Sequence, residues 1–469
     1  MQFSQVGEFA SEIGHEHVRA RVERVDHHLP LDGARDLDAA DLEVGRSRGN
    51  APVRVVADVL RLRQEVRQLA GRQALHPLGA RLQQADALGV EVAVELGDEC
   101  ERLVGQDALR PGDGRPGDLA HGHVRASYVV GSDSWIADAH VDLLLEVASR
   151  RAGGEANPFG EHWLPQLRAG GVRLQVCPVY VQGDLVPDGA LRGALALAAA
   201  FHVTVRDTPE VLQVVSQADL DPVESGERLG LMLALEGTEA LGSSPELIDA
   251  FWALGVRMVG LTWARRNAFA DGSGEPSPGG LSKLGEELVD RLVELGCAID
   301  LAHASERTFD DVLERVGGDG ALIVSHTCCR AVRDTPRNTS DEQLRAIAAC
   351  DGLVGIMALA SAVDPDRHDL DRYLDHVEHA VSVAGPERVC LGGDFMAQLV
   401  RSGTVRITPR ELSTLPPKLE PGTPVTGLAG PEDYPAVAEG LRRRGHDENV
   451  VAAILHGNLV HFLRRTLPF

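Results

Sequence analysis

The sequence predicts an α/β protein whose main part, residues 131–469, folds as a TIM-type (β/α)8 barrel. Eight apolar runs of strand length follow one another along the chain, and segments with helical spacing of apolar residues separate them. The runs are 135–142, 172–181, 229–237, 256–262, 296–303, 321–327, 352–359 and 388–395. Such strands indicate a parallel sheet buried on both faces. Eight units fit a barrel better than an open doubly wound sheet, which is the alternative.

The helical segments between these runs complete the alternating pattern. They are expected at 189–207, 244–255, 282–296, 305–316 and 340–350. Ser282 stands at the start of one of them, and its hydroxyl suits the N-cap because it can accept a bond from a free backbone amide. The helices are expected to cover the sheet.

Residues 1–130 differ from the rest and are expected to form a separate, poorly ordered extension. They contain no Trp and no Lys but many Arg, Asp and His. The segment 53–88 has helical spacing of Val and Leu, whereas 108–123 combines Gly, Pro and charge as linkers do. Two explanations are open for this part of the chain. It is a regulatory or docking domain, or it is an upstream stretch included because the start was wrongly assigned. No chemistry is assigned to it.

The charge and the cysteines restrict the partners and the compartment. The formal net charge of −24 argues against nucleic acid or an anionic membrane as a partner. Seven cysteines, an odd number without a CxxC pair, favour free thiols in a reducing cytoplasm. No apolar stretch approaches the roughly 20 residues of a membrane span. We therefore expect a soluble cytoplasmic protein of bacterial type, for which a homodimer is an open possibility.

Six side chains with metal-binding chemistry stand at the tails of five of the apolar runs. They are His140, Asp142, Glu236, His303, His326 and Asp394. Because the carboxyl ends of all barrel strands converge on one mouth, these residues are expected to meet there. A single histidine at a strand end is usually structural, so the prediction rests on the shared position of the set. Imidazole mixed with carboxylate suits zinc and other hard or borderline divalent cations.

This set of ligands is larger than one tetrahedral zinc ion requires. Two cations about 3.5–4 Å apart, bridged by a carboxylate and a hydroxide, would use three imidazoles and two or three carboxylates. Such a pair makes a hydroxide nucleophile available near neutral pH and polarises a carbonyl group, and a free carboxylate nearby can move the proton. The expected reaction class is hydrolysis of an amide-like bond.

From about residue 135 to 465 the chain resembles the membrane (renal) dipeptidase family of binuclear zinc metallopeptidases. The most specific combination is IDLAHAS (299–305), followed by SHT (325–327) and then RN (337–338). Further matching segments, in family order, are DAHVD (138–142), LEG (235–237), GLTWARRNAFADG (260–272) and GGDF (392–395).

The resemblance implies a (β/α)8 barrel that holds two zinc ions and cleaves dipeptides, so that a small peptide is the expected partner. By position, His140 and Asp142 would hold one zinc ion. His303 and His326 would hold the other, and Glu236 would bridge the two. Manganese or cobalt would also suit these ligands.

The resemblance assigns roles to three further residues. Asp394 would orient the bridging hydroxide and pass its proton to the leaving amine. Arg337 would clamp the terminal carboxylate of the substrate, because a guanidinium binds a carboxylate through two parallel hydrogen bonds. Asn338, beside it, is placed with the substrate-binding residues and is expected to shape the loop.

The chain departs from the family pattern at the substrate side of the site. After the pair LT, better-known members carry a His that would stabilise the tetrahedral intermediate, and this chain has Trp263. Its indole donates one hydrogen bond but cannot carry a positive charge. Arg265, Arg266 and Asn267 are candidates for the missing donor, and a different substrate is the other explanation.

Two further departures lie near the end of the chain. The family's GGDFDG reads GGDFMAQ here, with Met396 and Ala397 in place of the usual acid and glycine. The family's late GGN reads HGN (456–458), so that His456 faces either the barrel mouth or the surface, the latter being favoured.

Three functions are therefore open. The first is a dipeptidase that uses two zinc ions and acts on small peptides with a free carboxylate. The second is a related barrel hydrolase of another small amide, an N-acyl amino acid or a lactam, which Trp263 favours. The third is a metal-binding scaffold without catalysis, which is disfavoured because the whole set of metal-site residues is present.

Overall fold

The structure, a computed structural model, describes residues 20–21, 43–44, 135–317, 320–406 and 419–469. The chain divides into two units, Met1–His123 and Val124–Phe469. Of the first unit, the description covers only the strands β1 (Ala20–Arg21) and β2 (Glu43–Val44), which pair antiparallel. The other expectations for residues 1–130, including the helical spacing of 53–88, lie outside the described residues and stay predictions.

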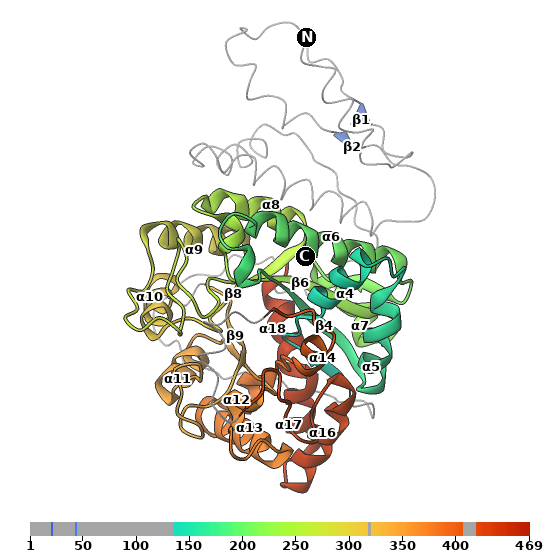
Figure 1. Cartoon of the computed structure of the whole chain (residues 1–469), viewed down its shortest axis with the longest axis vertical. Helices are drawn as coiled ribbons and strands as arrows, with labels where there is room; N and C mark the ends of the chain where they lie inside the picture. The colour runs from blue at the N-terminus through green and yellow to red at the C-terminus, as the bar shows by residue number, and fades with distance from the viewer. Residues whose placement is uncertain (1–19, 22–42, 45–134, 318–319, 407–418) are drawn as a thin grey trace, which may run out of the picture. The chain divides into compact units, whose positions relative to one another are not determined.

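Eight parallel strands of the second unit close into a barrel (Figure 1). They are β3 (Ile136–Asp138), β4 (Val172–Tyr180), β6 (Leu229–Glu236), β7 (Val256–Gly260), β8 (Ala298–Asp300), β9 (Leu322–Thr327), β10 (Leu353–Ile356) and β11 (Val389–Leu391). The ring closes where Leu391 of β11 pairs with Asp138 of β3. The predicted (β/α)8 barrel is thus confirmed and the open sheet is excluded, because an open sheet would leave two unpaired edges.

One short strand was not predicted. β5 (Val211–Gln213) pairs in parallel with the first residues of β6, whereas the later residues of β6 pair with β7. β5 follows the long helix α6 (Ala190–Asp207) and leads the chain back to the barrel. At three residues it is too short to give a clear periodic signal in the sequence.

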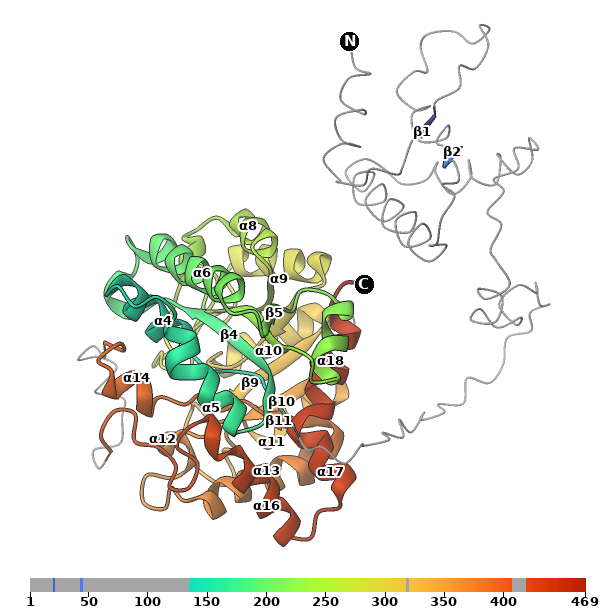
Figure 2. The same ribbon diagram turned by 90° about the vertical axis from the view of Figure 1, so that its right-hand side faces the viewer.

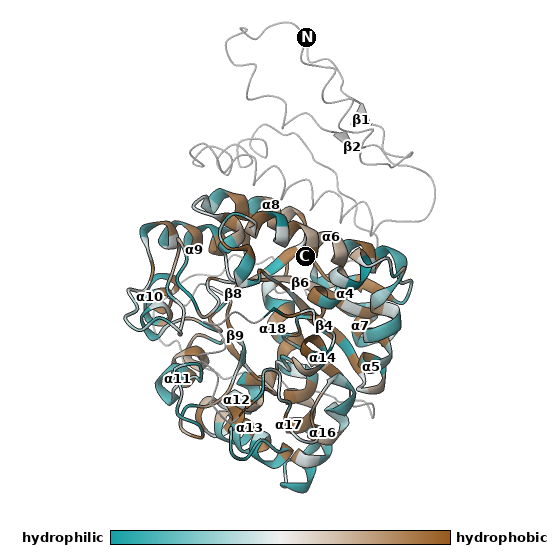
Figure 3. Ribbon diagram, viewed as in Figure 1, coloured by the Kyte–Doolittle hydropathy of each residue, from teal (hydrophilic) through white to brown (hydrophobic). Residues whose placement is uncertain are grey.

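Helices surround the strands, with their apolar sides turned toward the sheet (Figure 3). The longer ones are α4 (Leu143–Ala152), α6 (Ala190–Asp207), α9 (Lys283–Leu295), α10 (Glu306–Val316), α11 (Asp341–Ala349), α13 (Leu370–Ala384), α16 (Tyr434–Arg443) and α18 (Asn458–Thr466). The shorter ones are α5 (Leu164–Ala169), α7 (Asp221–Glu224), α8 (Ile248–Ala253), α12 (Ala360–Val363), α14 (Ala397–Arg401) and α17 (Glu448–Ala452). The helices predicted at 189–207, 244–255, 282–296, 305–316 and 340–350 are all present.

The predicted cap of α9 is also present. The hydroxyl oxygen of Ser282 accepts a hydrogen bond from the backbone N–H of Gly285 at 3.1 Å. Ser305 caps α10 in the same way, through the N–H of Thr308. None of the described helices combines the length and the apolar composition needed to cross a bilayer.

The two ends of the barrel differ, and Figure 2 shows α14 and α18 at opposite ends of the strands. At the amino end, Leu459, Phe462 and Leu463 of α18 pack against apolar side chains inside the barrel. The side-chain amide of Asn458 donates to the carbonyl of Val389, the first residue of β11. The amino end is therefore filled by a helix, which leaves the carboxyl end as the open mouth.

This arrangement decides the position of His456. Its ring stacks on Trp135, which precedes β3, with 4.4 Å between the ring centroids and 12° between the planes. Trp135 and Asn458 both lie at the amino end of the barrel. His456 therefore does not face the mouth, and that position considered from the sequence is wrong. Its side chain is partly exposed at the amino end of the barrel.

His376 of α13 gives the fold a testable dependence on pH. Its Nδ1 accepts the backbone N–H of Cys329 (3.0 Å) and its Nε2 donates to the carbonyl of Val363 (2.9 Å), so the ring is neutral. Burial lowers the pKa of His376 from 6.5 to about 4. The contribution of this histidine to stability is complete above pH 6.5 and is lost as the pH falls toward about 4.

We predict that His376→Gln flattens the dependence of unfolding free energy on pH in this window. The unaltered chain should lose up to about 3 kcal/mol of unfolding free energy between pH 6.5 and pH 4 through protonation of His376, and glutamine cannot be protonated in this way. Urea unfolding at several pH values between 4 and 7 measures the slope for both chains. Equal slopes would show that protonation of His376 does not contribute.

Candidate metal centre

Glu236 lies at the centre of the predicted set. It is the last residue of β6, and its Oε1 lies 3.0 Å from Nε2 of His303 and 3.6 Å from Nε2 of His326. Its Oε2 lies 3.8 Å from Nε2 of His140. One carboxylate therefore faces all three imidazoles, which come from the ends of β3, β8 and β9.

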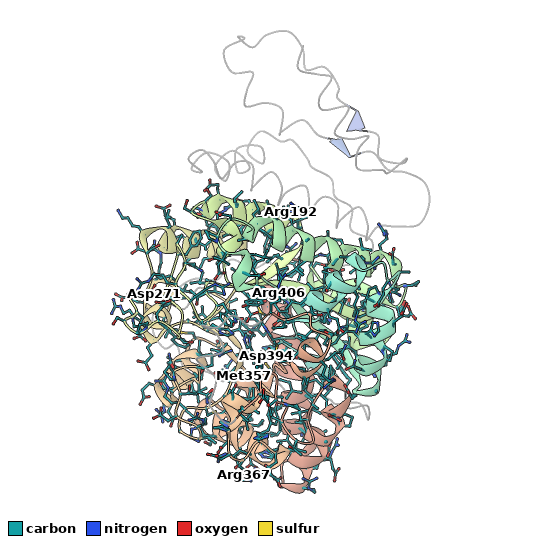
Figure 4. All side chains as sticks on the ribbon, viewed as in Figure 1. Arg192, Asp271, Met357, Arg367, Asp394 and Arg406 are labelled. Carbon is teal, nitrogen blue, oxygen red and sulfur yellow. The ribbon has the colours of Figure 1, made fainter. Side chains whose placement is uncertain are left out.

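The six predicted side chains form two adjoining groups in which the possible ligand atoms lie within 4.8 Å of one another. His140, Asp142 and Asp394 make up one group, and Glu236, His303 and His326 make up the other. Figure 4, seen from the mouth of the barrel, places Asp394 near its middle. The structure thus brings together all six residues expected to meet at the mouth.

Several buried polar atoms of this cluster have no hydrogen-bond partner. They are Nε2 of His140, Oδ1 of Asp142, Oε2 of Glu236 and Nδ1 of His303. Leaving a polar atom unpaired in the interior costs about 1–3 kcal/mol, so a concentration of such atoms calls for a ligand. Nitrogen and carboxylate oxygen donors together fit a divalent cation such as zinc.

The pKa shifts show what burial does to these groups without a cation. Burial lowers the pKa of His140 to about 3, and Arg337 adds to the effect. Burial first, and repulsion from Asp394 second, raises the pKa of Asp142. Burial also raises the pKa of Glu236 well above its usual value. Each shift favours the neutral form, and a bound cation would reverse the balance for the carboxylates.

A chain of hydrogen bonds orients His326. The carboxylate of Asp300, the last residue of β8, accepts the hydroxyl of Ser325 at 2.5 Å. The Ser325 Oγ lies 2.8 Å from Nδ1 of His326, and this bond directs Nε2 of the ring into the cluster. Such partners behind a metal ligand fix its orientation and tautomer.

Asp138 organises the opposite side in a similar way. It is buried at the end of β3 and accepts the backbone N–H groups of His140 (3.0 Å) and Gly393 (2.9 Å). The hydroxyl of Tyr434 donates to its other oxygen at 2.6 Å. Asp138 therefore joins the loops that carry His140 and Asp394. Asp138 and Asp300 were not predicted as site residues, although both are acids that end a strand.

Two residues of the cluster have unusual backbone conformations. His303 has φ of 64° and Asp394 has φ of 49°. Residues other than glycine rarely adopt this left-handed region, and they do so most often at functional sites. The backbone N–H of Asp394 donates to the carbonyl of His140 at 2.9 Å, which holds the two loops together. Burial raises the pKa of Asp394 to about 7.

Arg337 and Asn338 occupy different places in the loop after β9. Nη2 of Arg337 donates to the carbonyl of His326 (3.0 Å), lies 3.1 Å from Nε2 of His303, and faces the pocket beside the cluster. Asn338 is buried, and its side-chain amide donates to the carbonyls of Arg333 and Ala362. Arg337 thus lines the pocket, whereas the side chain of Asn338 holds the loop together and is not among the residues that line the pocket.

Trp263 also lines the pocket, in the loop after β7. The donors considered as replacements for the family's histidine are engaged elsewhere. Arg265 pairs with Glu239 (2.8 Å) and Arg266 pairs with Asp271 (2.6 Å). The side-chain amide of Asn267 donates to the carbonyl of Leu261 at 2.8 Å.

Known proteins are similar to this chain in sequence, and solved structures are similar to it in fold. The chain is 29% identical over 242 residues to dipeptidase verJ of Clonostachys rogersoniana, which covers 50% of this chain and 62% of that relative. It is 26% identical over 313 residues to dipeptidase 3 of Rattus norvegicus, which covers 65% of this chain and 58% of that relative. The chain therefore spans about three fifths of the length of these curated relatives.

Solved structures of metallopeptidases have a fold similar to that of this chain. The structure of dipeptidase AC, a metallopeptidase, matches with a TM-score of 0.61 at 25% identity, over 72% of this chain and 100% of that chain. A metallopeptidase from Rhodobacter sphaeroides, liganded with a phosphinate mimic of the dipeptide L-Ala-D-Ala, matches with a TM-score of 0.60 at 24% identity, over 71% of this chain and 100% of that chain. The second likeness supports the fold alone.

A (β/α)8 barrel with histidine and carboxylate clusters at its mouth is an arrangement typical of metal-dependent hydrolases. Residues 125–404 match the model of the family described as membrane dipeptidase, peptidase family M19. Because this match covers more than half of the chain, the protein belongs to the membrane dipeptidase family, and the resemblance seen in the sequence is confirmed.

We predict that Asp300→Asn weakens the binding of zinc by about 10- to 100-fold. The substitution removes the charged acceptor for Ser325 and so loosens the orientation of His326. Competition with a chromophoric chelator measures the affinity. Asp290→Asn, at an exposed carboxylate of α9 that pairs with Arg315, is the matched control and should bind zinc as the unaltered chain does. An unchanged affinity in Asp300→Asn would contradict the orienting role.

Proposed function

We propose that this protein hydrolyses the peptide bond of dipeptides with the help of two divalent cations, most simply zinc. The observation that carries the proposal is the position of Glu236, whose two carboxylate oxygens face different imidazoles at the barrel mouth. A carboxylate in this position suits a bridge between two cations. Membership of the membrane dipeptidase family supports the same substrate class.

The chain supplies separate ligands for each cation. His140 and Asp142 would hold one cation, and His303 and His326 would hold the other. Glu236 would bind both cations. Two bound cations would polarise a carbonyl group and lower the pKa of a bound water molecule, so that hydroxide would be available near neutral pH. The buried carboxylates would then be held ionised by the positive charge.

Asp394 is the proton carrier in this proposal. It lies in the same group of ligand atoms as His140 and Asp142, and its backbone is tied to His140. Hydrolysis adds the oxygen of water to the carbonyl carbon and breaks the bond from that carbon to nitrogen. Asp394 would accept the proton of the water and deliver it to the leaving nitrogen, which departs as an amine.

Arg337 would hold the terminal carboxylate of the dipeptide. Within the described part of the chain, Nη2 is the nitrogen of this guanidinium that contacts other residues, His303 and the carbonyl of His326. The other N–H groups can bind a carboxylate with two parallel bonds. This contact would place the peptide bond beside the metal centre, because Arg337 also touches His303.

Hydrolysis of another small amide, an N-acyl amino acid or a lactam is the second candidate, and Trp263 is the feature that favours it. Metal analysis followed by a panel of dipeptides at neutral pH separates the two. Two bound cations with dipeptide turnover support the first, and two cations without turnover support the second. A chain that binds no zinc, manganese or cobalt would overturn both. The cytoplasmic location and the homodimer stay predictions from the sequence.

We predict that Glu236→Gln abolishes dipeptide hydrolysis and lowers the bound metal from two ions to one. A neutral amide cannot offset the charge of two cations, and its nitrogen cannot act as a ligand as an oxygen does. Elemental analysis and turnover measure the two effects. Glu294→Gln, at an exposed position of α9, is the matched control and should behave as the unaltered chain. Full activity in Glu236→Gln would refute the bridge.

We predict that Arg337→Ala raises KM for dipeptides far more than for their C-terminally amidated analogues. A C-terminal amide lacks the charged oxygens that the guanidinium would bind, so the KM of the amidated substrate should change little. Steady-state kinetics on matched pairs of substrates gives the comparison. Arg333→Ala changes an arginine of the same loop that bonds to the carbonyl of Asp334, and it should affect neither substrate. Equal increases for both substrates would exclude the carboxylate clamp.

A further inference from the structure

The pocket beside the metal centre has two kinds of surface. It encloses about 170 Å³, and one side consists of the metal-site carboxylates, His303 and Arg337. Apolar residues that line it come from the end of β4, from the loops after β7 and β10, and from the segment around α14. Six of them are Tyr180, Trp263, Leu359, Met396, Val400 and Val405. We refer to these six residues as the apolar wall.

Trp263 is held firmly within the apolar wall. Its ring centroid lies 5.4 Å from that of Tyr180 and 5.6 Å from that of His303. The guanidinium of Arg265 lies over both aromatic rings, at 5.2 Å from Trp263 and 5.8 Å from Tyr180. Cations at this distance from an aromatic face are attracted to it. The indole is therefore packed between two rings and one guanidinium.

Arg265 is fixed in turn. Its Nε pairs with Glu239 at 2.8 Å, and its Nη2 donates to the carbonyl of Val181 at 2.7 Å. Both partners belong to the barrel mouth, since Val181 follows β4 and Glu239 follows β6. Arg265 thus acts as a positioning residue for Trp263, and the indole presents a preformed surface.

The apolar wall restricts what a substrate can place against it. A polar or charged side chain packed against the indole would lose its water and gain no hydrogen bond from the face of the ring. Polar residues also line the pocket, namely Ser361, Arg406, Glu420 and Thr423, and the guanidinium of Arg406 pairs with Asp184 at 3.1 Å. An apolar side chain would bury its own surface and that of the indole, and discrimination by such contacts reaches about 10- to 200-fold per group.

We propose that Trp263 determines the substrate specificity of this protein and selects dipeptides that carry a bulky apolar side chain, such as leucine or phenylalanine. This inference rests on the proposed dipeptidase function. By the resemblance in the sequence, the indole takes the place of a histidine, and it presents an extended apolar face to the pocket. In this proposal the indole contacts the side chain of the substrate.

The test compares dipeptides in which each residue in turn is glycine, alanine, aspartate, leucine or phenylalanine. The zinc-loaded full chain should show kcat/KM about 10- to 100-fold higher for the leucine or phenylalanine series than for the glycine and aspartate series. Trp263→Phe keeps an aromatic face and should keep this order. Trp263→His should reduce the preference to a few-fold. Metal content and melting temperature show that the variants are folded.

A binding measurement separates this inference from the proposed reaction. Phosphinate analogues of dipeptides with methyl, carboxymethyl, isobutyl or benzyl side chains are titrated by calorimetry into the same three proteins. Tighter binding of the isobutyl and benzyl compounds, lost in Trp263→His, supports the inference even where no dipeptide is hydrolysed, in which case only the proposed function fails. Turnover without any side-chain preference, or a preference that survives in Trp263→His, overturns the role of Trp263.

Discussion

The burial of several ionisable side chains around one carboxylate is the constraint on which the site depends. Glu236 faces three imidazoles, and Asp142 and Asp394 lie beside them, while Arg337 is the cation that contacts the group. Without further positive charge the pKa values of the carboxylates rise and those of the histidines fall, because the interior penalises charge. Such a cluster is costly as it stands and becomes favourable when cations bind. The fold accepts this cost at the barrel mouth, where function is concentrated.

The barrel supports this cluster through residues that do not belong to it. Asp138 and Asp300 end two strands and use their carboxylates to hold backbone N–H groups and the Ser325 hydroxyl. Two glycines also support the cluster, because they let neighbouring strands come close together. A Cβ at Gly355 or Gly392 would lie 1.9 Å from the carbonyl oxygen of Ser325. β9, β10 and β11 can therefore approach closely enough to direct His326 into the site. At the opposite end of the barrel, the side chains of α18 pack against the apolar interior, and the described residues there form no comparable cluster.

The pocket places the cluster of possible metal ligands beside the aromatic surface of Trp263. Arg265, Glu239 and Tyr180 fix Trp263, so the residue that departs from the family pattern is built into the site and is not a loose replacement. The same arrangement explains why Arg265 does not serve as the missing hydrogen-bond donor. Its charge is directed to Glu239 and to the aromatic faces.

The sequence by itself determined the barrel, because apolar runs of strand length and helical periodicity are local patterns that the chain repeats eight times. It also determined which six side chains to expect at the mouth, because parallel strands of a barrel end at the same place. Only the tertiary structure decided that Asp138 and Asp300 orient the ligands, that Asn338 points away from the pocket, and that His456 lies at the amino end. These outcomes depend on contacts between residues far apart in the chain, such as Tyr434 with Asp138, and no local pattern records which distant partner a side chain meets.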